Sequence, residues 1–147
     1  MPFEIVRNDI TNMAVDAIVN TANPKPLIGS GTDAGIHAKA GPALLEARKK
    51  IGNIPVGSSA ITLGYGFDAK YVIHTVGPVW QGGGHDEEKL LRQCYDSALN
   101  LADSPRTGRC KSPSKRSARF CRNMRCRFIW WYSIRMLSGF RKSCSTG

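Results

Sequence analysis

Apolar and polar positions along the first hundred residues follow a pattern that predicts strands alternating with helices. Short β-branched runs bounded by turn residues indicate strands, and apolar residues spaced three or four apart indicate helices. A strand that is apolar at nearly every position and flanked by helical segments is typical of a sheet covered on both faces. The sequence therefore predicts an α/β domain. The expected strands are residues 3–6, 15–20, 59–64 and 70–75, and the expected helices are residues 34–50 and 87–101.

The expected strand at 15–20 leads into a polar loop that contains glycines. Asn20 and Asn23 come first, Gly29 and Gly31 follow, and Asp33 precedes the helical residues. Because glycine has no Cβ, backbone N–H groups at such a loop can approach a phosphate closely, above all where a helix starts. Open α/β sheets place their ligands at the carboxyl ends of the strands. We therefore expect a ligand site in this loop.

Two well-known glycine-loop motifs do not describe this stretch. A P-loop requires Lys and then Ser or Thr directly after its second glycine, whereas Thr32 and Asp33 follow Gly31. A dinucleotide-binding loop requires the spacing G-x-G-x-x-G, and here Gly35 comes one residue too late. The loop must therefore bind its ligand through another arrangement.

Several motifs in a common order make residues 3–102 resemble a macro domain, the ADP-ribose-binding α/β module, of the bacterial hydrolase-like branch. The motifs are NDIT at 8–11, VDAIVNTAN at 15–23, GSGTDAGIH at 29–37, AGP at 40–42 and AKYVIHTVGPVW at 69–80. The resemblance implies a mixed sheet with helices on both faces. It also implies binding of ADP-ribose, and hydrolysis of ADP-ribose attached to protein side chains or of O-acetyl-ADP-ribose esters.

The resemblance implies a role for individual residues of these motifs. Asp9 contacts the adenine amino group, Asn23 contacts the distal ribose, and Asp33 positions or deprotonates the catalytic water, so that Asp33 and Asn23 form the expected catalytic pair. The remaining expected ligand-binding residues are Ile10, Asn20, Gly29, Ser30, Gly31 and Thr32, with Gly29 to Gly31 at the phosphates. No metal and no cofactor is implied for this branch.

Each of these polar side chains also has a structural interpretation. Asp9 is suited to cap a short helical turn at 10–14, and Asp33 is suited to cap a helix that starts at Ala34. The amides of Asn20 and Asn23 are suited to tie down the loop. Three further residues are expected to serve the structure alone: His74 as a hydrogen-bonded core histidine, Cys94 as a core thiol and His85 on the surface.

Charge divides the chain into two parts near Asp103. Residues 1–103 carry 9 Lys and Arg against 11 Asp and Glu, whereas residues 104–147 carry 12 Lys and Arg and no acidic residue. Four of the five cysteines lie in the second part. We therefore expect the N-terminal part of a macro domain at 1–103 and a basic, Cys- and Arg-rich tail at 104–147.

The tail does not continue the macro-domain pattern. The family continues after Ala102 with a strand and a second phosphate loop of the type Ser-Thr-Gly-x-Tyr-Gly, which this chain lacks. We hypothesise that the tail is an out-of-frame translation, so that the C-terminal part of the domain is missing or replaced. The codons of Trp130, Trp131 and Tyr132 can be read in the frame in which each new codon starts at the third base of the previous one. In that frame they give Val-Val, preceded by Leu or Met. With free codon choice elsewhere, residues 125–147 can be read as AMQIYLVVFDTDAFRLSEKLF, and the coding DNA tests this reading.

Three other interpretations of the tail remain. Twelve cations together with aromatic residues promise nonspecific contact with nucleic acid. Cys121 and Cys126 lack a second close pair and a tail histidine, which disfavours a zinc site. The apolar run at 128–134 is suited to add a strand to the sheet, or to aggregate if it does not.

The function hypotheses differ in whether chemistry survives without the second phosphate loop. The first is a hydrolase of ADP-ribose derivatives, the second is a noncatalytic ADP-ribose-binding module, and the third is a truncated product that has lost its activity. The expected partners are ADP-ribose or an ADP-ribosylated protein, and no membrane. The start of the chain lacks the features of a signal peptide, and no apolar run approaches the ~20 residues of a membrane span. A cytoplasmic location with reduced thiols is therefore expected.

Overall fold

The structure is a computed structural model, and it describes residues 9–104 together with the backbone of residues 128–130. In chain order its elements are η1 (Ile10–Asn12), β1 (Ala17–Thr21), α1 (Thr32–Ala40), α2 (Pro42–Ile51), β2 (Ser59–Leu63), β3 (Tyr71–Thr75), α3 (Glu87–Ala102) and β4 (Phe128–Trp130). The strand expected at 3–6 lies outside the described residues. The tail cysteines and all twelve tail cations, on which the zinc-site and nucleic-acid interpretations rest, also lie outside the described residues.

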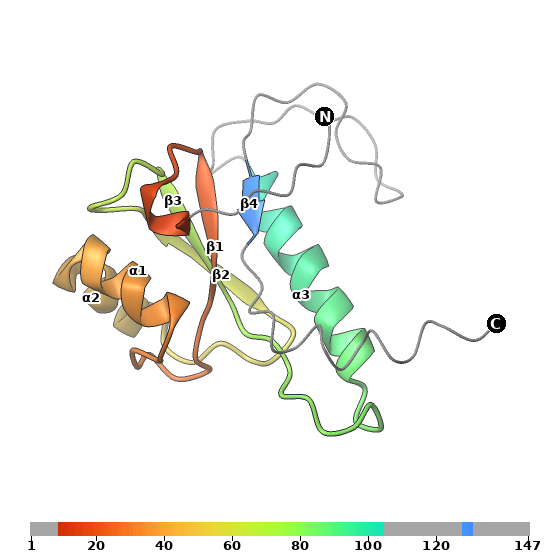
Figure 1. Cartoon of the computed structure of the whole chain (residues 1–147). Helices are drawn as coiled ribbons and strands as arrows, with labels where there is room; N and C mark the ends of the chain where they lie inside the picture. The colour runs from red at the N-terminus through yellow and green to blue at the C-terminus, as the bar shows by residue number, and fades with distance from the viewer. Residues whose placement is uncertain (1–8, 105–127, 131–147) are drawn as a thin grey trace.

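The four strands form one mixed sheet in the order β2-β3-β1-β4 (Figure 1). β2 runs antiparallel to β3, and β1 runs parallel both to β3 and to β4. β4 lies within the apolar run at 128–134, so part of this run does add a strand to the sheet. The predicted α/β class with a mixed sheet is confirmed.

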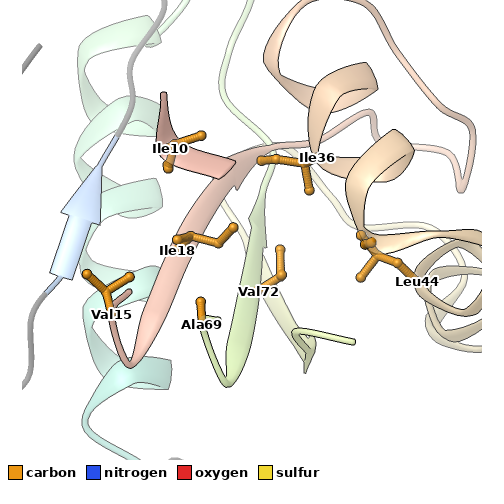
Figure 2. Close-up of a cluster of buried hydrophobic side chains, with 8 residues drawn as sticks. Ile10, Val15, Ile18, Ile36, Leu44, Ala69 and Val72 are labelled. Atoms are coloured by element: carbon orange, nitrogen blue, oxygen red, sulfur yellow. The ribbon is translucent and has the colours of Figure 1, made fainter. Parts of the chain in front are cut away.

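Helices cover both faces of the sheet, with α1 and α2 on one side and α3 on the other (Figure 1). The side chains of β1 alternate between these faces, as the two-residue period of a strand requires. Ile18 packs into the cluster under α1 and α2, whereas Val19 packs into the cluster under α3. The first core cluster, under α1 and α2, comprises Ile10, Val15, Ile18, Ile36, Ala40, Leu44, Ala69 and Val72 (Figure 2). Fully burying one such aliphatic side chain stabilises the fold by about 1.5–3 kcal/mol.

The single helix expected at 34–50 is wrong, because the structure has two helices there. α1 ends at Ala40, Gly41 adopts φ +78°, and α2 begins at Pro42. A left-handed glycine ends a helix readily, and proline at the first position of the next helix costs nothing because that N–H has no helical partner. Separated in this way, α1 and α2 contact one another and cover one face of the sheet together.

None of the helices in the described part of the chain is both long and apolar enough to cross a membrane.

Candidate functional site

The sheet register brings two polar side chains together at the carboxyl end of β1. Asn20 lies opposite His74 in the parallel pairing of β1 with β3, and both residues are fully buried. Asn20 Nδ2 lies 3.2 Å from His74 Nδ1. Both residues follow the two-residue period of Ile18 and Val72, so they extend the face of the sheet that lies under α1. A polar contact therefore replaces the apolar core where the two strands end.

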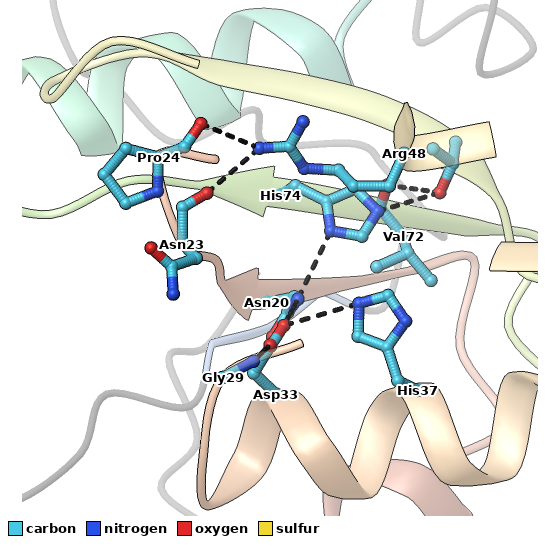
Figure 3. A network of polar contacts seen from close by, with 10 residues as sticks. Asn20, Asn23, Pro24, Gly29, Asp33, His37, Arg48, Val72 and His74 are labelled. Carbon is cyan, nitrogen blue, oxygen red and sulfur yellow. Dashed lines mark hydrogen bonds and ion pairs between the residues drawn. The ribbon is translucent and has the colours of Figure 1, made fainter. Parts of the chain in front are cut away.

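Asp33, in the first turn of α1, closes this contact from the helix side (Figure 3). Asn20 Nδ2 donates to Asp33 Oδ1 at 2.6 Å, and the backbone N–H of Gly29 donates to Asp33 Oδ2 at 2.6 Å. His37 Nε2, one helical turn further on, lies 3.6 Å from Asp33 Oδ1. The carboxylate is only 4% exposed. Asp33 therefore fixes the start of α1 to both β1 and the glycine loop.

The interpretation of Asp33 as a helix cap is wrong. α1 begins at Thr32, its N-cap residue is Gly31 with φ +63°, and no side chain caps it. The backbone N–H of Gly29 donates to Asp33 Oδ2, and the expected place of Gly29 at the phosphates stays a prediction. A Cβ on Gly29 would lie 3.2 Å from Asp33 Oδ2, so glycine permits this close approach. Ser30 and Gly31 are exposed and lie beside the uncapped first turn.

The protons of the buried contact can be assigned from its partners. Burial, followed by the charges of Arg48 and His37, lowers the pKa of His74 from 6.5 to about 3, so the ring is neutral at pH 7. Asn20 donates one amide hydrogen to Asp33 and the other to His74 Nδ1, which leaves the ring proton on Nε2. This nitrogen lies 3.0 Å from Thr62 Oγ1. The prediction of a hydrogen-bonded core histidine is confirmed.

The turn that carries Asn23 is fixed through its backbone, whereas the Asn23 side chain is exposed. Arg48 Nη2 donates to Asn23 O at 2.9 Å and to Pro24 O at 3.3 Å, and Nη1 donates to Gly52 O. The N–H of Ile54 also donates to Pro24 O, at 2.9 Å. Arg48 is only 2% exposed. The exposed carboxamide of Asn23 is therefore carried by a turn whose carbonyl groups are fixed by hydrogen bonds from Arg48 and Ile54.

No role was assigned to Arg48 from the sequence, so its contact with the turn was not predicted. The signal that could have revealed it is its distance from Leu44. Residues four apart share one face of a helix, and Leu44 is fully buried in the first core cluster. An arginine on that face must direct its guanidinium into the fold or along its edge.

Asp9 and Ile10 lie at the short turn η1. Asp9 is exposed, and its Oδ1 accepts from Thr11 N at 2.9 Å, so the prediction that Asp9 caps a helical turn is confirmed. This backbone hydrogen bond is the main reason for the lowered pKa of Asp9. The side chain of Ile10 belongs to the first core cluster. Lys39, near the end of α1, ties η1 to that helix by donating to Thr11 O at 2.5 Å.

A second buried carboxylate organises the loop between β3 and α3. Glu87 is 3% exposed and accepts from three backbone N–H groups, those of Gln81 at 2.9 Å, Gly83 at 3.2 Å and His85 at 2.7 Å. Burial raises the pKa of Glu87, but the backbone hydrogen bonds outweigh it and bring the pKa to about 2. Cys94 is fully buried and donates to Val76 O, and His85 is exposed, as predicted. Within the described ranges, no three His, Cys, Asp or Glu residues are grouped to hold a metal ion.

The family model of the macro domain matches residues 19–114. The chain belongs to the macro domain family. The match includes the end of β1 with Asn20, the glycine loop, α1 with Asp33, and β3 with His74. The motif resemblance identified in the sequence is therefore confirmed.

Curated macro domain proteins are similar to this chain over about two thirds of its length. A macro domain-containing protein of Methanosarcina mazei is 55% identical over 98 residues, which are 67% of this chain and 52% of that protein. A protein of Escherichia coli K12 named O-acetyl-ADP-ribose deacetylase is 50% identical over 101 residues, which are 66% of this chain and 57% of that protein. The chain thus matches little more than half the length of these relatives.

Solved macro domains share the fold. The macrodomain of Oceanobacillus iheyensis with ADP has a TM-score of 0.62 and 39% sequence identity, over 65% of this chain and 54% of that one. The macrodomain of Trypanosoma brucei in complex with ADP has a TM-score of 0.59 and 42% identity, over 64% of this chain and 38% of that one.

Proposed function

We propose that this chain binds ADP-ribose at the carboxyl end of β1. The observation that carries the proposal is the uncapped start of α1, which Asp33 holds against Asn20, together with the exposed side chain of Asn23, three positions after Asn20. The first turn of a helix has backbone N–H groups without helical partners, and its dipole favours an anion there. A diphosphate is the chemical group that such a site accommodates. The macrodomains solved with ADP support this assignment.

The exposed polar side chains suit the two ends of ADP-ribose. In this proposal the diphosphate lies at Ser30, Gly31 and Thr32, because the N–H of Gly29 already serves Asp33. The carboxamide of Asn23 can both donate to and accept from the hydroxyl groups of the distal ribose. The exposed carboxylate of Asp9 accepts from the adenine amino group.

Calorimetric titrations with ADP-ribose and with ADP test this proposal. Asn23→Ala should weaken ADP-ribose binding by about three- to tenfold, the equivalent of one lost hydrogen bond, and leave ADP binding unchanged because ADP has no distal ribose. Asp9→Ala should weaken both ligands. Asn100→Ala and Asp96→Ala, exposed on α3, are the matched controls and should change neither. A monodisperse protein that gives no heat with ADP-ribose would refute the proposal.

A second candidate function, hydrolysis of O-acetyl-ADP-ribose, rests on the surroundings of Asp33. Asn20 holds the carboxylate of Asp33, and His37 lies one turn away. In this proposal the carboxylate faces the distal ribose. Relatives named O-acetyl-ADP-ribose deacetylase support it. Both oxygens of Asp33 already accept hydrogen bonds, which hold the carboxylate in place. We therefore expect Asp33 to orient a water from this fixed position.

Turnover separates this hydrolase from a noncatalytic ADP-ribose-binding module. Release of acetate from O-acetyl-ADP-ribose should be measured for the wild type and for Asp33→Asn, which keeps the volume of the side chain and removes its charge. A hydrolase loses turnover in the variant and still binds ADP-ribose. A binding module shows no turnover in either protein, although it binds ADP-ribose in both.

A further inference from the structure

The buried guanidinium of Arg48 contacts backbone carbonyl oxygens. It donates hydrogen bonds to the carbonyl oxygens of Asn23, Pro24 and Gly52. Burial lowers the pKa of Arg48, and the charge of Asp33 opposes this shift. Taking a cation out of water is costly unless hydrogen bonds compensate for it. Carbonyl oxygens supply that compensation here, so the position of these three carbonyl groups and the position of the charge depend on each other.

The geometry of the guanidinium couples two separate segments. Nη1 contacts Gly52, the C-cap residue of α2, and Nη2 contacts the turn that follows β1 (Figure 3). The planar fork of arginine can hold both segments at once, whereas the ammonium group of lysine has no such fixed arrangement of donors. Arg48 therefore fixes the distance and the orientation between the end of α2 and the turn at Asn23.

In the turn after β1, the backbone carbonyl groups and the side chain of Asn23 point in opposite directions. The carbonyl groups of Asn23 and Pro24 point toward Arg48, and the carboxamide of Asn23 points away from it (Figure 3). Pro24 O has a second donor in the N–H of Ile54, and Ala22 N donates to Thr75 O at 2.8 Å. Without Arg48, Ala22 and Pro24 would keep these backbone hydrogen bonds on either side of Asn23. The carbonyl of Asn23 would lose the hydrogen bond from Arg48.

From this arrangement we propose that Arg48 is a positioning residue that orients Asn23 and thereby sets the preference for ADP-ribose over ADP. The inference rests on the proposed function, in which Asn23 binds the distal ribose. A residue that only stabilises the fold would affect both ligands alike. A residue that acts through Asn23 affects only the ligand that carries the distal ribose.

Titrations of ADP-ribose and ADP into Arg48→Met, Arg48→Lys and Lys50→Met test the proposal. Methionine fills most of the volume of the arginine stem without donating, and lysine keeps the charge without the fork. Lys50 is an exposed cation at the end of the same helix, so Lys50→Met is the matched control. We expect Arg48→Met to weaken ADP-ribose binding by about three- to tenfold and to leave ADP binding within about twofold. Arg48→Lys should show part of this loss, and Lys50→Met should show none.

Urea unfolding of each variant accompanies the titrations, and Arg48→Lys carries the test if Arg48→Met does not fold. An unchanged preference for ADP-ribose, or an equal loss for both ligands, would overturn the role of Arg48 in selectivity. If the wild type does not bind ADP-ribose, the proposed function fails, and this inference fails with it. A further outcome is that Asn23→Ala reduces the preference for ADP-ribose over ADP while the Arg48 variants leave that preference unchanged. In that case the proposed function stands and only this inference is wrong.

Discussion

The buried ring of His74 predicts that the protein loses stability in mild acid. Its pKa is about 3 in the folded chain, against an ordinary value of 6.5. Between these values the unfolded chain binds a proton that the folded chain does not, so the free energy of unfolding falls as the pH falls. The slope is about 1.4 kcal/mol per pH unit once the unfolded ring is protonated. Integrated from pH 7 to pH 5, the loss that is due to His74 is about 2 kcal/mol.

Urea unfolding at pH 7 and at pH 5, followed by circular dichroism, measures this loss. His74→Gln has no ionisable group, so its free energy of unfolding should fall by about 2 kcal/mol less than that of the wild type over the same interval. The variant is expected to be less stable at both pH values, and only the difference between them matters. Glu87 contributes in a lower window, as the pH falls from 4.5 through 2.

His85→Gln is the matched control, because it removes an exposed ring and should keep the wild-type difference. If the wild type and His74→Gln lose the same free energy between pH 7 and pH 5, His74 is not held neutral by its surroundings. The proton assignment that runs from Asp33 through Asn20 to Thr62 would then be wrong.

Three further predictions concern single positions. The three loop amides that donate to Glu87 should titrate together by NMR near pH 2 rather than near pH 4.5, and Glu87→Ala should abolish that titration. Gly31→Ala should cost about 1–3 kcal/mol in urea unfolding because φ is +63°, whereas Gly35→Ala, in open space within α1, should gain up to about 1 kcal/mol. Leu44→Ala should lower the free energy of unfolding by about 2–5 kcal/mol, and the exposed Leu63→Ala by less than ~0.5 kcal/mol.

Local signals in the sequence were sufficient to predict most of the described elements and the end of the sheet where the candidate site lies. The apolar runs predict strands, and the glycines near residues 20 to 33 predict a loop, by rules that act within one segment. The break between α1 and α2 was also visible as Gly41-Pro42, but the helical spacing on either side obscured it.

The contacts of the site depend on pairing between distant segments, which no local pattern specifies. Asn20 meets His74 only because β1 and β3 pair in one register across more than fifty residues. The N–H of Gly29 donates to Asp33 Oδ2, a contact that the glycine spacing did not predict. Arginine is usually a surface residue, so residue type alone does not predict that Arg48 is buried. The guanidinium of Arg48 finds its acceptors only because the turn after β1 lies next to it.

The position of β1 inside the sheet affects how the chain folds during synthesis. β1 lies between β3 and β4, yet it is the first strand of the described part to leave the ribosome. More than a hundred residues separate it from β4, which corresponds to roughly 5–20 s at ~5–20 residues per second. Throughout this delay one edge of β1 carries unpaired backbone groups that another nascent chain can bind. The yield of folded chain therefore depends on the speed of translation as well as on equilibrium stability.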